Sequence, residues 1–317
     1  AREPRLAIDA LERVTAAAPD EAEGFFLLGR AQRMAGEAEG AEEAFGRALE
    51  LQPTHSEARV MLGYLLLDTG QFEEADELYQ ELARRVGRSG TGRSYALVGR
   101  LGRVEALLGL GRVEDAKVQL ENVRESDREL PTVKLVEARV ALADGRPGDA
   151  VSALRPLAQS EGARPDVIAL FGDALYAANE TRAAAEVYER ALGIDEAHPE
   201  SLLGFATVLL RGNKAREAGE ILDRAAAALE ARIRPPRLTG QLYTLRGRAA
   251  LEDGDEGAAR EALRAATEIE TAPAEAWFYL GEALAGANSP EARQAYETYL
   301  EKAPEGPLAS RARRAIR

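Results

Sequence analysis

The sequence contains no cysteine and is poor in several other residue types. Its 317 residues include only two histidines, two methionines and one tryptophan, and aromatic residues make up 5% of the chain. The absence of cysteine excludes disulfides and thiolate metal sites. His55 and His198 lie far apart in the sequence, each within two residues of a proline in a predicted connector. We therefore expect no metal site.

The sequence also lacks long apolar runs, and its net charge is negative. No apolar run reaches the roughly 20 residues that a membrane-spanning helix needs. The net charge is −13 at pH 7, which argues against general binding to nucleic acid or anionic lipid. Arginine far outnumbers lysine, as in proteins from GC-rich genomes. We expect a bacterial, cytoplasmic protein without membrane insertion. A periplasmic location stays open, because the sequence begins at Ala1 without methionine.

No catalytic motif is present. The sequence has no Gly-x-Ser-x-Gly elbow, no zinc-protease helix motif and no cysteine nucleophile. Gly87-x4-Gly92-Arg93-Ser94 approaches a phosphate-binding loop, but it follows a predicted helix and has Arg93 where that loop needs lysine. We therefore predict no enzyme activity and no cofactor.

The stretch from Ala22 to Pro53 predicts two antiparallel helices. An apolar stripe of helical spacing ends at Gly36, and a second stripe ends before Pro53. The stripes consist of Phe25, Leu28, Gly29 and Gln32, and of Ala41, Phe45, Ala48 and Leu49. Two helices of this size cannot bury their own apolar faces. The unit must therefore stack on copies of itself.

The alanine that begins the second stripe recurs along the whole chain. Its spacing is 34, 41, 34, 34, 34, 41 and 33 residues, at Ala41, Ala75, Ala116, Ala150, Ala184, Ala218, Ala259 and Ala292. This register predicts eight helix pairs over residues 22–306. A half unit over 1–19 precedes them, and a capping helix over 307–317 follows. At helix crossings, we expect nearly complete burial of Ala41, Ala75, Ala150, Ala184 and Ala218.

A helix–turn–helix unit of this length resembles the tetratricopeptide repeat (TPR) family. The best match is Trp277-x-x-Leu280-Gly281, followed by Leu284, Ala292, Tyr296 and Pro304, with Leu284 where the family usually has tyrosine. The resemblance implies an all-α fold, a right-handed superhelical solenoid of antiparallel helix pairs with a concave and a convex face. It also implies protein binding, without indicating which partner is bound.

Additional apolar residues follow the core stripe of several first helices. Solvent-facing helix positions normally carry charge, so apolar groups there suggest a binding face. Val60 and Leu203 can also be interpreted as core. We predict a non-catalytic scaffold or adaptor that binds another protein or peptide segment in the concave groove. The candidate groove residues are Phe26, Arg30, Val60, Tyr64, Tyr176, Leu203 and Phe278.

Two basic runs suggest an alternative function. Each 41-residue step contains seven extra residues, near 87–95 and 232–240, inside a segment without aspartate or glutamate. The alternative is a binder of an anionic ligand, an acidic partner or nucleic acid, although such a run is usually a solvated surface. A regulatory module of a larger protein is a further alternative. The candidate contacts are Arg88, Arg93, Arg234 and Arg237.

Two further expectations concern the first and third units. Leu11 and Val14 of the helix predicted over residues 5–15 should pack on the first full pair. The other side of that helix would expose apolar surface, a route to self-association through the N-terminal end. In the third pair, Arg100 and Arg103 stand where apolar residues are usual, which suggests a rotated first helix.

Overall fold

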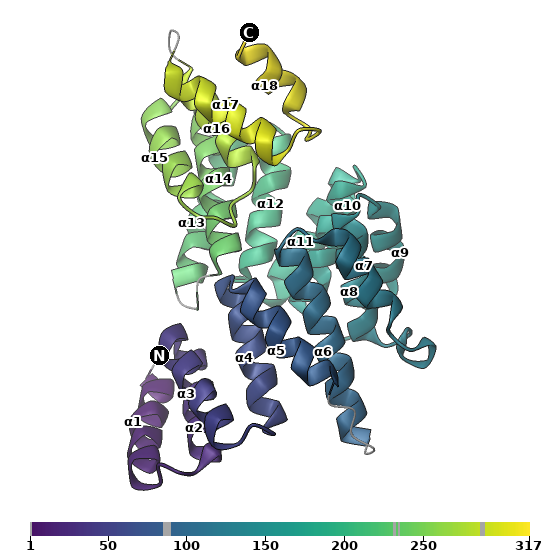
Figure 1. Ribbon diagram of the computed structural model, residues 1–317. Helices are drawn as coiled ribbons and strands as arrows, with labels where there is room; N and C mark the ends of the chain where they lie inside the picture. The colour runs from purple at the N-terminus through teal and green to yellow at the C-terminus, as the bar shows by residue number, and fades with distance from the viewer. Residues whose placement is uncertain (1, 85–89, 231–232, 234, 286–288) are drawn as a thin grey trace. The chain divides into compact units, whose positions relative to one another are not determined.

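The computed structural model describes residues 2–84, 90–230, 233, 235–285 and 289–317, with only the backbone given for 2–3 and 90–93 (Figure 1). Within these residues the regular structure is helical and contains no strand. The α-helices are α1 Arg2–Ala17, α2 Ala22–Ala35, α3 Ala38–Leu51, α4 Ser56–Thr69, α5 Phe72–Arg84, α6 Gly90–Gly109, α7 Val113–Glu121, α8 Pro131–Ala143, α9 Pro147–Ala158, α10 Pro165–Ala177, α11 Thr181–Ile194, α12 Pro199–Arg211, α13 Ala215–Glu230, α14 Pro236–Asp253, α15 Glu256–Thr267, α16 Glu275–Leu284, α17 Pro290–Lys302 and α18 Ala309–Ala315.

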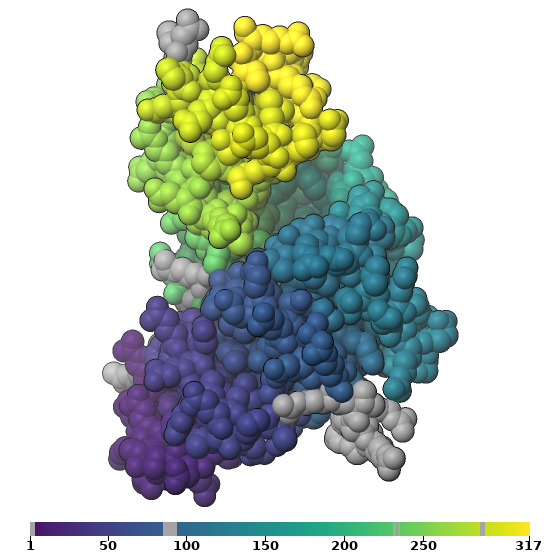
Figure 2. Space-filling model, viewed as in Figure 1, coloured from purple at the N-terminus to yellow at the C-terminus, as the bar shows by residue number. Residues whose placement is uncertain are grey.

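The helices build a repeat solenoid, which confirms the predicted fold class. From α2 to α17, each even-numbered helix packs against the odd-numbered helix that follows it. We call these the first and second helices of a pair. Helix α1 packs on α2, and α18 packs on α17. The space-filling view shows the side chains of neighbouring helices in contact, for example in α1 to α3 (Figure 2).

Contacts divide the chain into two compact units. Unit 1 consists of Ala1–Gln159 and Ala231–Arg234, and therefore holds α1 to α9. Unit 2 consists of Ser160–Glu230 and Pro235–Arg317, and holds α10 to α18. The alanine spacing continues across this division without change, so the sequence register gave no sign of it.

Left-handed residues end several first helices and turn the chain back. Gly36 after α2 and Gly70 after α4 both have φ 83°, and Asn179 after α10 has φ 68°. Glycine and asparagine tolerate this conformation better than other residues, so they favour a helix end at these positions. The backbone N–H of Gly36 donates back to carbonyls of the last turn of α2.

The recurring alanines lie at the helix crossings. Their predicted burial is confirmed, because Ala41, Ala75, Ala150, Ala184 and Ala218 are all 0% exposed. Each second helix presents this small residue and a larger one, such as Phe45, to its partner helix. A Cβ atom on Gly29 would lie only 2.7 Å from the Phe45 ring. The first and second helices can therefore approach closely at this point.

The two seven-residue insertions lengthen first helices. Helix α6 has 20 residues and α14 has 18, whereas α2 and α4 have 14. Residues 90–95 and 236–240 of the insertions are helical, so they extend first helices rather than the connectors. The added turns are held by packing: Leu238 is 3% exposed, and Tyr95 packs against the core between α4, α5 and α6. Residues 87–89, 232 and 234 of the insertions lie outside the described residues.

Arg103, one of the two arginines of the third pair, makes polar contacts with the second helices on both sides of α6. Arg103 has a side chain that is only 17% exposed, and its Nε donates to Asp76 Oδ1 of α5 at 2.7 Å. Its Nη1 also donates to Gln119 of α7 at 3.2 Å. Leu101 and Val104 fill the core of α6 instead. The rotation suggested for this helix stays a prediction.

Helix α1 packs on α2 through a different stripe from the predicted one. Leu11 is partly buried in a cluster with Ile8, and Thr15 is 8% exposed. The prediction for Val14 is wrong, because its side chain is 50% exposed. Ile8, Leu11 and Thr15 follow helical spacing, which leaves Val14 at the edge of the contact. Leu6 is also exposed, at 68%.

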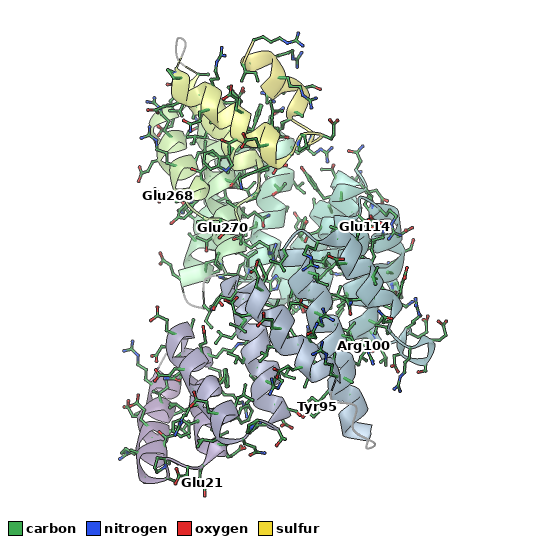
Figure 3. The ribbon with its side chains drawn as sticks, viewed as in Figure 1. Glu21, Tyr95, Arg100, Glu114, Glu268 and Glu270 are labelled. Atoms are coloured by element: carbon green, nitrogen blue, oxygen red, sulfur yellow. The ribbon has the colours of Figure 1, made fainter. Side chains whose placement is uncertain are left out.

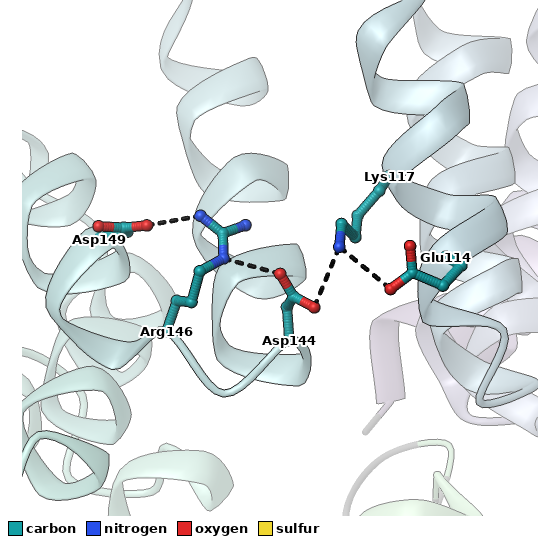
Figure 4. Close-up of polar contacts among 5 residues, drawn as sticks. All are labelled: Glu114, Lys117, Asp144, Arg146 and Asp149. Carbon is teal, nitrogen blue, oxygen red and sulfur yellow. Dashed lines mark hydrogen bonds and ion pairs between the residues drawn. The ribbon is translucent and has the colours of Figure 1, made fainter.

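An ion-pair network joins α7 to the connector between α8 and α9 (Figure 4). Lys117 Nζ lies 3.0 Å from Glu114 Oε1 and 3.2 Å from Asp144 Oδ1. Arg146 Nε donates to Asp144 Oδ2 at 2.7 Å and also pairs with Asp149. Hydrogen bonds from Arg146, and then from Lys117, lower the pKa of Asp144.

Overpacking one of the crossing alanines tests the repeat register. We expect Ala218→Leu to lower the free energy of unfolding by about 1–3 kcal/mol, because the site has no room for three more carbon atoms. Ala227 lies exposed on the same helix, so Ala227→Leu should change stability by less than about 0.5 kcal/mol. Calorimetry of both variants makes the comparison, and equal melting temperatures would show that Ala218 is not a crossing residue.

The network predicts a pH-dependent effect of Asp144→Asn. A carboxyl group with a lowered folded pKa stabilises the fold above its ordinary pKa of 3.8, and this contribution is lost as the pH falls through the folded value. The variant should melt below the wild type near pH 7, and the gap should close as the pH falls below the ordinary pKa of the carboxyl group. Thermal unfolding over this pH range measures the gap. A gap that is the same at every pH would mean that charge is not its cause.

Candidate partner-binding surface

Within each unit, the first helices form the inner face. Successive first helices contact one another, as α2 and α4, α4 and α6, or α12 and α14 do. In the described residues, successive second helices lie further apart, and Arg264 of α15 reaches Glu291 of α17 through an ion pair at 3.3 Å. Open grooves lie there instead, of about 620 Å³ between α1 and α3 and about 510 Å³ between α13 and α15. The first helices lie closer together than the second helices. The first-helix face is therefore the concave face within each unit.

Unit 1 exposes large apolar side chains on this face. Met34 of α2 is 76% exposed and Tyr64 of α4 is 41% exposed. The other large apolar side chains that the described residues expose lie on second helices, on α1 or in a connector: Leu6, Val14, Val118, Leu130 and Ile194. Met34 and Tyr64 are thus the only exposed ones on first helices in the part of the chain that the structure describes.

Helix α2 contributes one stripe to the surface. Phe26, Arg30 and Met34 are spaced four residues apart and therefore share a face. The Phe26 ring is mostly covered, since it packs 6.2 Å from the Phe45 ring and 4.7 Å from the His55 ring. The guanidinium of Arg30 lies above it, 5.6 Å from the ring centre. Arg30 is exposed, and no carboxylate partner is found for it among the described residues.

Ion pairs connect neighbouring first helices along this face. Arg33 Nη2 of α2 lies 2.9 Å from Asp68 Oδ2 of α4. Further along, Arg139 Nη1 of α8 lies 3.1 Å from Glu105 Oε2 of α6. These pairs hold the helices side by side and neutralise most of the charge between them. We call the area formed by Arg30, Arg33, Met34, Tyr64 and Asp68 the Tyr64 surface.

Tyr79 of α5 lies beneath this surface. Its ring fits between two first helices: a Cβ atom on Gly63 of α4 or on Gly102 of α6 would lie 2.4 or 2.6 Å from it. The ring of Tyr64 lies edge-on to that of Tyr79, with 6.4 Å between the centres. Tyr79 is 0% exposed, and its hydroxyl has no hydrogen-bond partner among the described residues.

Tyr95 joins the added turns of α6 to α4 (Figure 3). Its hydroxyl donates to Glu57 Oε1, at the start of α4. This hydrogen bond raises the pKa of Tyr95 to about 12 and lowers the pKa of Glu57. The contact fixes the N-terminal half of α6 against α4, and so supports the helix next to the Tyr64 surface.

Phe278 was predicted to be an exposed anchor of the groove, and this prediction is wrong. Its side chain is 0% exposed. The rings of Tyr279, Tyr296 and Tyr299 lie 5.5–5.7 Å away. Arg311 of α18 places its guanidinium 4.9 Å from the ring centre. The C-terminal helix therefore covers the position where a partner would have to bind.

Three other predicted groove residues are also buried. Phe26 is 8% exposed, Val60 8% and Leu203 0%. Neighbouring first helices account for the last two: Val60 packs in a cluster with Ala106 of α6, and Leu203 packs in a cluster that contains residues of α14. Their interpretation as core residues is therefore the correct one, and their role as contact residues is not supported.

Tyr176 of unit 2 is half-buried. The guanidinium of Arg211 lies 4.9 Å from its ring centre, and Arg211 Nη2 donates to Asn179 Oδ1 at 2.7 Å. The cation covers part of the ring that was predicted to face a partner. In the described part of unit 2, the first-helix face therefore lacks an exposed aromatic ring comparable with Tyr64.

The arginine runs carry less free charge than their sequence suggests. Arg246 Nη2 pairs with Asp223 at 2.6 Å, and Arg248 Nε pairs with Glu252 at 2.8 Å. Both carboxylates, Asp223 and Glu252, lie outside the acid-free segment of the sequence, so the segment alone did not show them. Arg237 is exposed. The side chains of Arg88, Arg93 and Arg234 lie outside the described residues.

Sequence reasoning missed three members of the Tyr64 surface, Arg33, Met34 and Asp68, and also Tyr79 beneath it. Met34 could have been found by continuing the four-residue spacing from Phe26 and Arg30. The Arg33–Asp68 pair joins equivalent turns of successive first helices, a relation that the repeat register contains. For Tyr79, the sequence signal is the residue after Gly63 of α4. That residue is Tyr64, whereas a carboxylate follows the corresponding glycine in α10 and α16.

Two other kinds of site are not found. In the described ranges, no group of histidine, aspartate and glutamate side chains could hold a metal ion. Among the same residues, no helix has both the length and the apolarity needed to cross a bilayer.

Solved structures share this fold at low sequence identity. The crystal structure of the APC/C hetero-tetramer Cut9-Hcn1 superposes with a TM-score of 0.70 and 14% identity, and the match covers all of this chain but 60% of that one. A tetratricopeptide repeat protein from Parabacteroides merdae superposes with a TM-score of 0.52 and 13% identity, covering 88% of this chain and 98% of that one. A comparison with curated proteins finds no match.

Two family models match the sequence, and both describe the tetratricopeptide repeat. One matches residues 32–89 and 175–234. The other matches residues 1–56, 135–199 and 244–307, which is more than half of the chain. Tetratricopeptide repeats generally mediate protein–protein interaction, and proteins built from them are generally non-catalytic scaffolds. The chain belongs to the tetratricopeptide repeat family.

Proposed function

We propose that the protein is a non-catalytic scaffold or adaptor whose first-helix face in unit 1 binds a segment of a partner protein. The observation that carries this proposal is the exposure of Met34 and Tyr64 on first helices of unit 1, whereas the described first helices of unit 2 expose no large apolar side chain. Exposed aromatic and methionine side chains on a concave face are typical anchors of recognition.

The chemistry of the Tyr64 surface favours an apolar contact. Its two large side chains are apolar or amphipathic, Arg33 and Asp68 neutralise each other at 2.9 Å, and Arg30 adds one exposed positive charge over the Phe26 ring. An apolar side chain of the partner would lie against Tyr64 and Met34. The charged pair would limit which segments fit, because a poorly placed charge would lose its solvation without gaining a partner.

The arginine edges are the competing location for binding. The partly neutralised arginines of unit 2 reduce the support for that alternative, since Arg246 and Arg248 already have carboxylate partners. Nucleic acid is an improbable ligand for a chain of net charge −13. The two locations also differ in how binding should depend on salt.

The proposal predicts that Tyr64→Ala weakens partner binding by about 1–2 kcal/mol, because the variant removes an anchoring ring from the surface. The partner is first identified by affinity purification and mass spectrometry, and its affinity is then measured by calorimetry. The matched control is Val118→Ala, which truncates an apolar side chain that is 54% exposed on the second helix α7. Circular dichroism should show unchanged helix content for both variants. Equal affinity of wild type and Tyr64→Ala for that partner would contradict the proposal.

A second prediction separates the Tyr64 surface from the arginine edges. Binding at an apolar surface should change little with ionic strength, whereas binding through arginine contacts should weaken steeply as salt is added. Arg237→Glu should therefore leave the affinity within about twofold of wild type. A marked loss of affinity in this variant, together with a steep salt dependence, would identify the arginine edge as the site.

A further inference from the structure

The hydroxyl of Tyr79 is a buried polar group without a hydrogen-bond partner in the described part of the chain. The whole side chain is 0% exposed. Nearly all buried polar groups in folded proteins are hydrogen-bonded, and leaving one unpaired destabilises the fold. An unpaired hydroxyl directly below a candidate binding surface therefore needs an explanation.

Two other tyrosines of the chain show where such a hydroxyl normally binds. The ring of Tyr188 also lies between two first helices, and its hydroxyl donates to Asp173 Oδ1 at 2.6 Å. Tyr296 donates to Glu282 Oε1 at 2.8 Å. Asp173 and Glu282 each directly follow the glycine that contacts the ring, Gly172 and Gly281. In both pairs, the hydroxyl therefore reaches an acceptor on the first-helix face.

The pair formed by α4 and α5 departs from this arrangement. The residue after Gly63 is Tyr64, so an aromatic ring takes the position that a carboxylate has in the other two pairs. Tyr64 provides no hydrogen bond to Tyr79, and their rings meet edge to face. The Tyr79 hydroxyl thus lies beneath the Tyr64 surface, and no described residue accepts a hydrogen bond from it.

A second unpaired donor belongs to the same surface. Arg33 Nε is buried without a partner among the described residues, while Nη2 of the same side chain binds Asp68. The Tyr79 hydroxyl and Arg33 Nε are both donors. A ligand that pairs with them would therefore have to supply an acceptor atom. Arg33 is also near enough to Tyr79 to influence the pKa of its hydroxyl.

The local field favours a neutral acceptor over an anion. Burial is the main cause that raises the pKa of Tyr79, and the nearby Tyr64, Asp68 and Glu105 raise it further, against a smaller opposite effect of Arg33. Two carboxylates, of Asp68 and Glu105, and one guanidinium, of Arg33, are therefore near enough to act on this hydroxyl. A carboxylate placed beside it would meet the same repulsion, whereas a carbonyl oxygen carries no net charge.

We propose that the Tyr64 surface binds an extended, apolar peptide segment through a main-chain carbonyl oxygen of that segment, which accepts the hydrogen bond of Tyr79. The inference rests on the proposed function and names the chemistry of its partner. Tyr64 is the side chain that moves aside. It is exposed, and exposed side chains change rotamer within nanoseconds. The displaced ring and Met34 then pack against a side chain next to the bound carbonyl.

A first experiment needs no partner. Tyr79→Phe removes a hydroxyl that has no partner, so its melting temperature should equal or exceed that of the wild type. Tyr188→Phe is the matched control, because it removes the hydrogen bond to Asp173 and should melt lower. If Tyr79→Phe melts lower by as much as Tyr188→Phe, the hydroxyl is already satisfied in the free protein, for example by a buried water, and the proposal is overturned.

A second experiment tests the acceptor directly. Short random peptides are selected by phage display on the wild-type chain, with counter-selection against Tyr64→Ala, and the selected peptide serves as the probe. Tyr79→Phe should bind this peptide about three- to tenfold more weakly than wild type, the loss of one hydrogen bond. Replacing single peptide carbonyls by thiocarbonyls, which are poorer acceptors, should locate one position that weakens binding to wild type but not to Tyr79→Phe.

The outcomes separate the inference from the function on which it rests. A selected peptide that binds wild type and Tyr79→Phe equally overturns the role of the hydroxyl but leaves the Tyr64 surface as a binding site. Coupling of Tyr79 to a peptide carboxylate, found by aspartate-to-asparagine or glutamate-to-glutamine changes, overturns the neutral acceptor. Failure to select any peptide that depends on Tyr64 overturns both this inference and the proposed function at this surface.

Discussion

The close approach of an aromatic ring to a first-helix glycine fixes the pairs α2–α3, α4–α5, α10–α11 and α16–α17. A Cβ atom on Gly63 would lie 2.4 Å from Tyr79, and one on Gly172 would lie 2.6 Å from Tyr188. Each ring also reaches the next first helix, where Gly102 and Gly204 leave the same space. One residue of a second helix therefore locks its own first helix and the following one. The space beside the ring holds the hydrogen atom of glycine but no Cβ atom. The contact therefore fixes both the spacing and the register of the helices.

This contact also decides which residues remain for recognition. Once the glycine faces the ring, the residue after it must point toward the first-helix face. In α10 and α16 that residue is a carboxylate that accepts the hydroxyl of the buried tyrosine. In α4 it is Tyr64, which is 41% exposed. In unit 2, this packing leaves buried tyrosine hydroxyls that are hydrogen-bonded to carboxylates of the first helices. In unit 1, it leaves an exposed aromatic ring above a hydroxyl without a described partner.

Most of the fold could be predicted from the sequence, because small residues recur at a regular spacing where helices cross. Ala184 and its equivalents mark every crossing, and their burial follows from helix spacing alone. The exposure of first-helix residues was harder to predict, since it depends on neighbours outside the pair. Phe278 is covered by α18, and Leu203 is buried with residues of α14. Such contacts depend on how far each helix extends, and the sequence pattern did not show that the insertions lengthen α6 and α14.

The two methionines of the chain allow a direct measurement of the central claim, that the first-helix face of unit 1 is the binding surface. Met34 is 76% exposed on this face, and Met61 is partly buried in the core of the same unit. In a chain labelled with ¹³C-methyl methionine, each methyl group gives its own NMR signal. Saturation with the identified partner should shift or broaden the Met34 signal and leave the Met61 signal nearly unchanged. A saturated complex in which the Met34 signal stays at its free position would contradict the account.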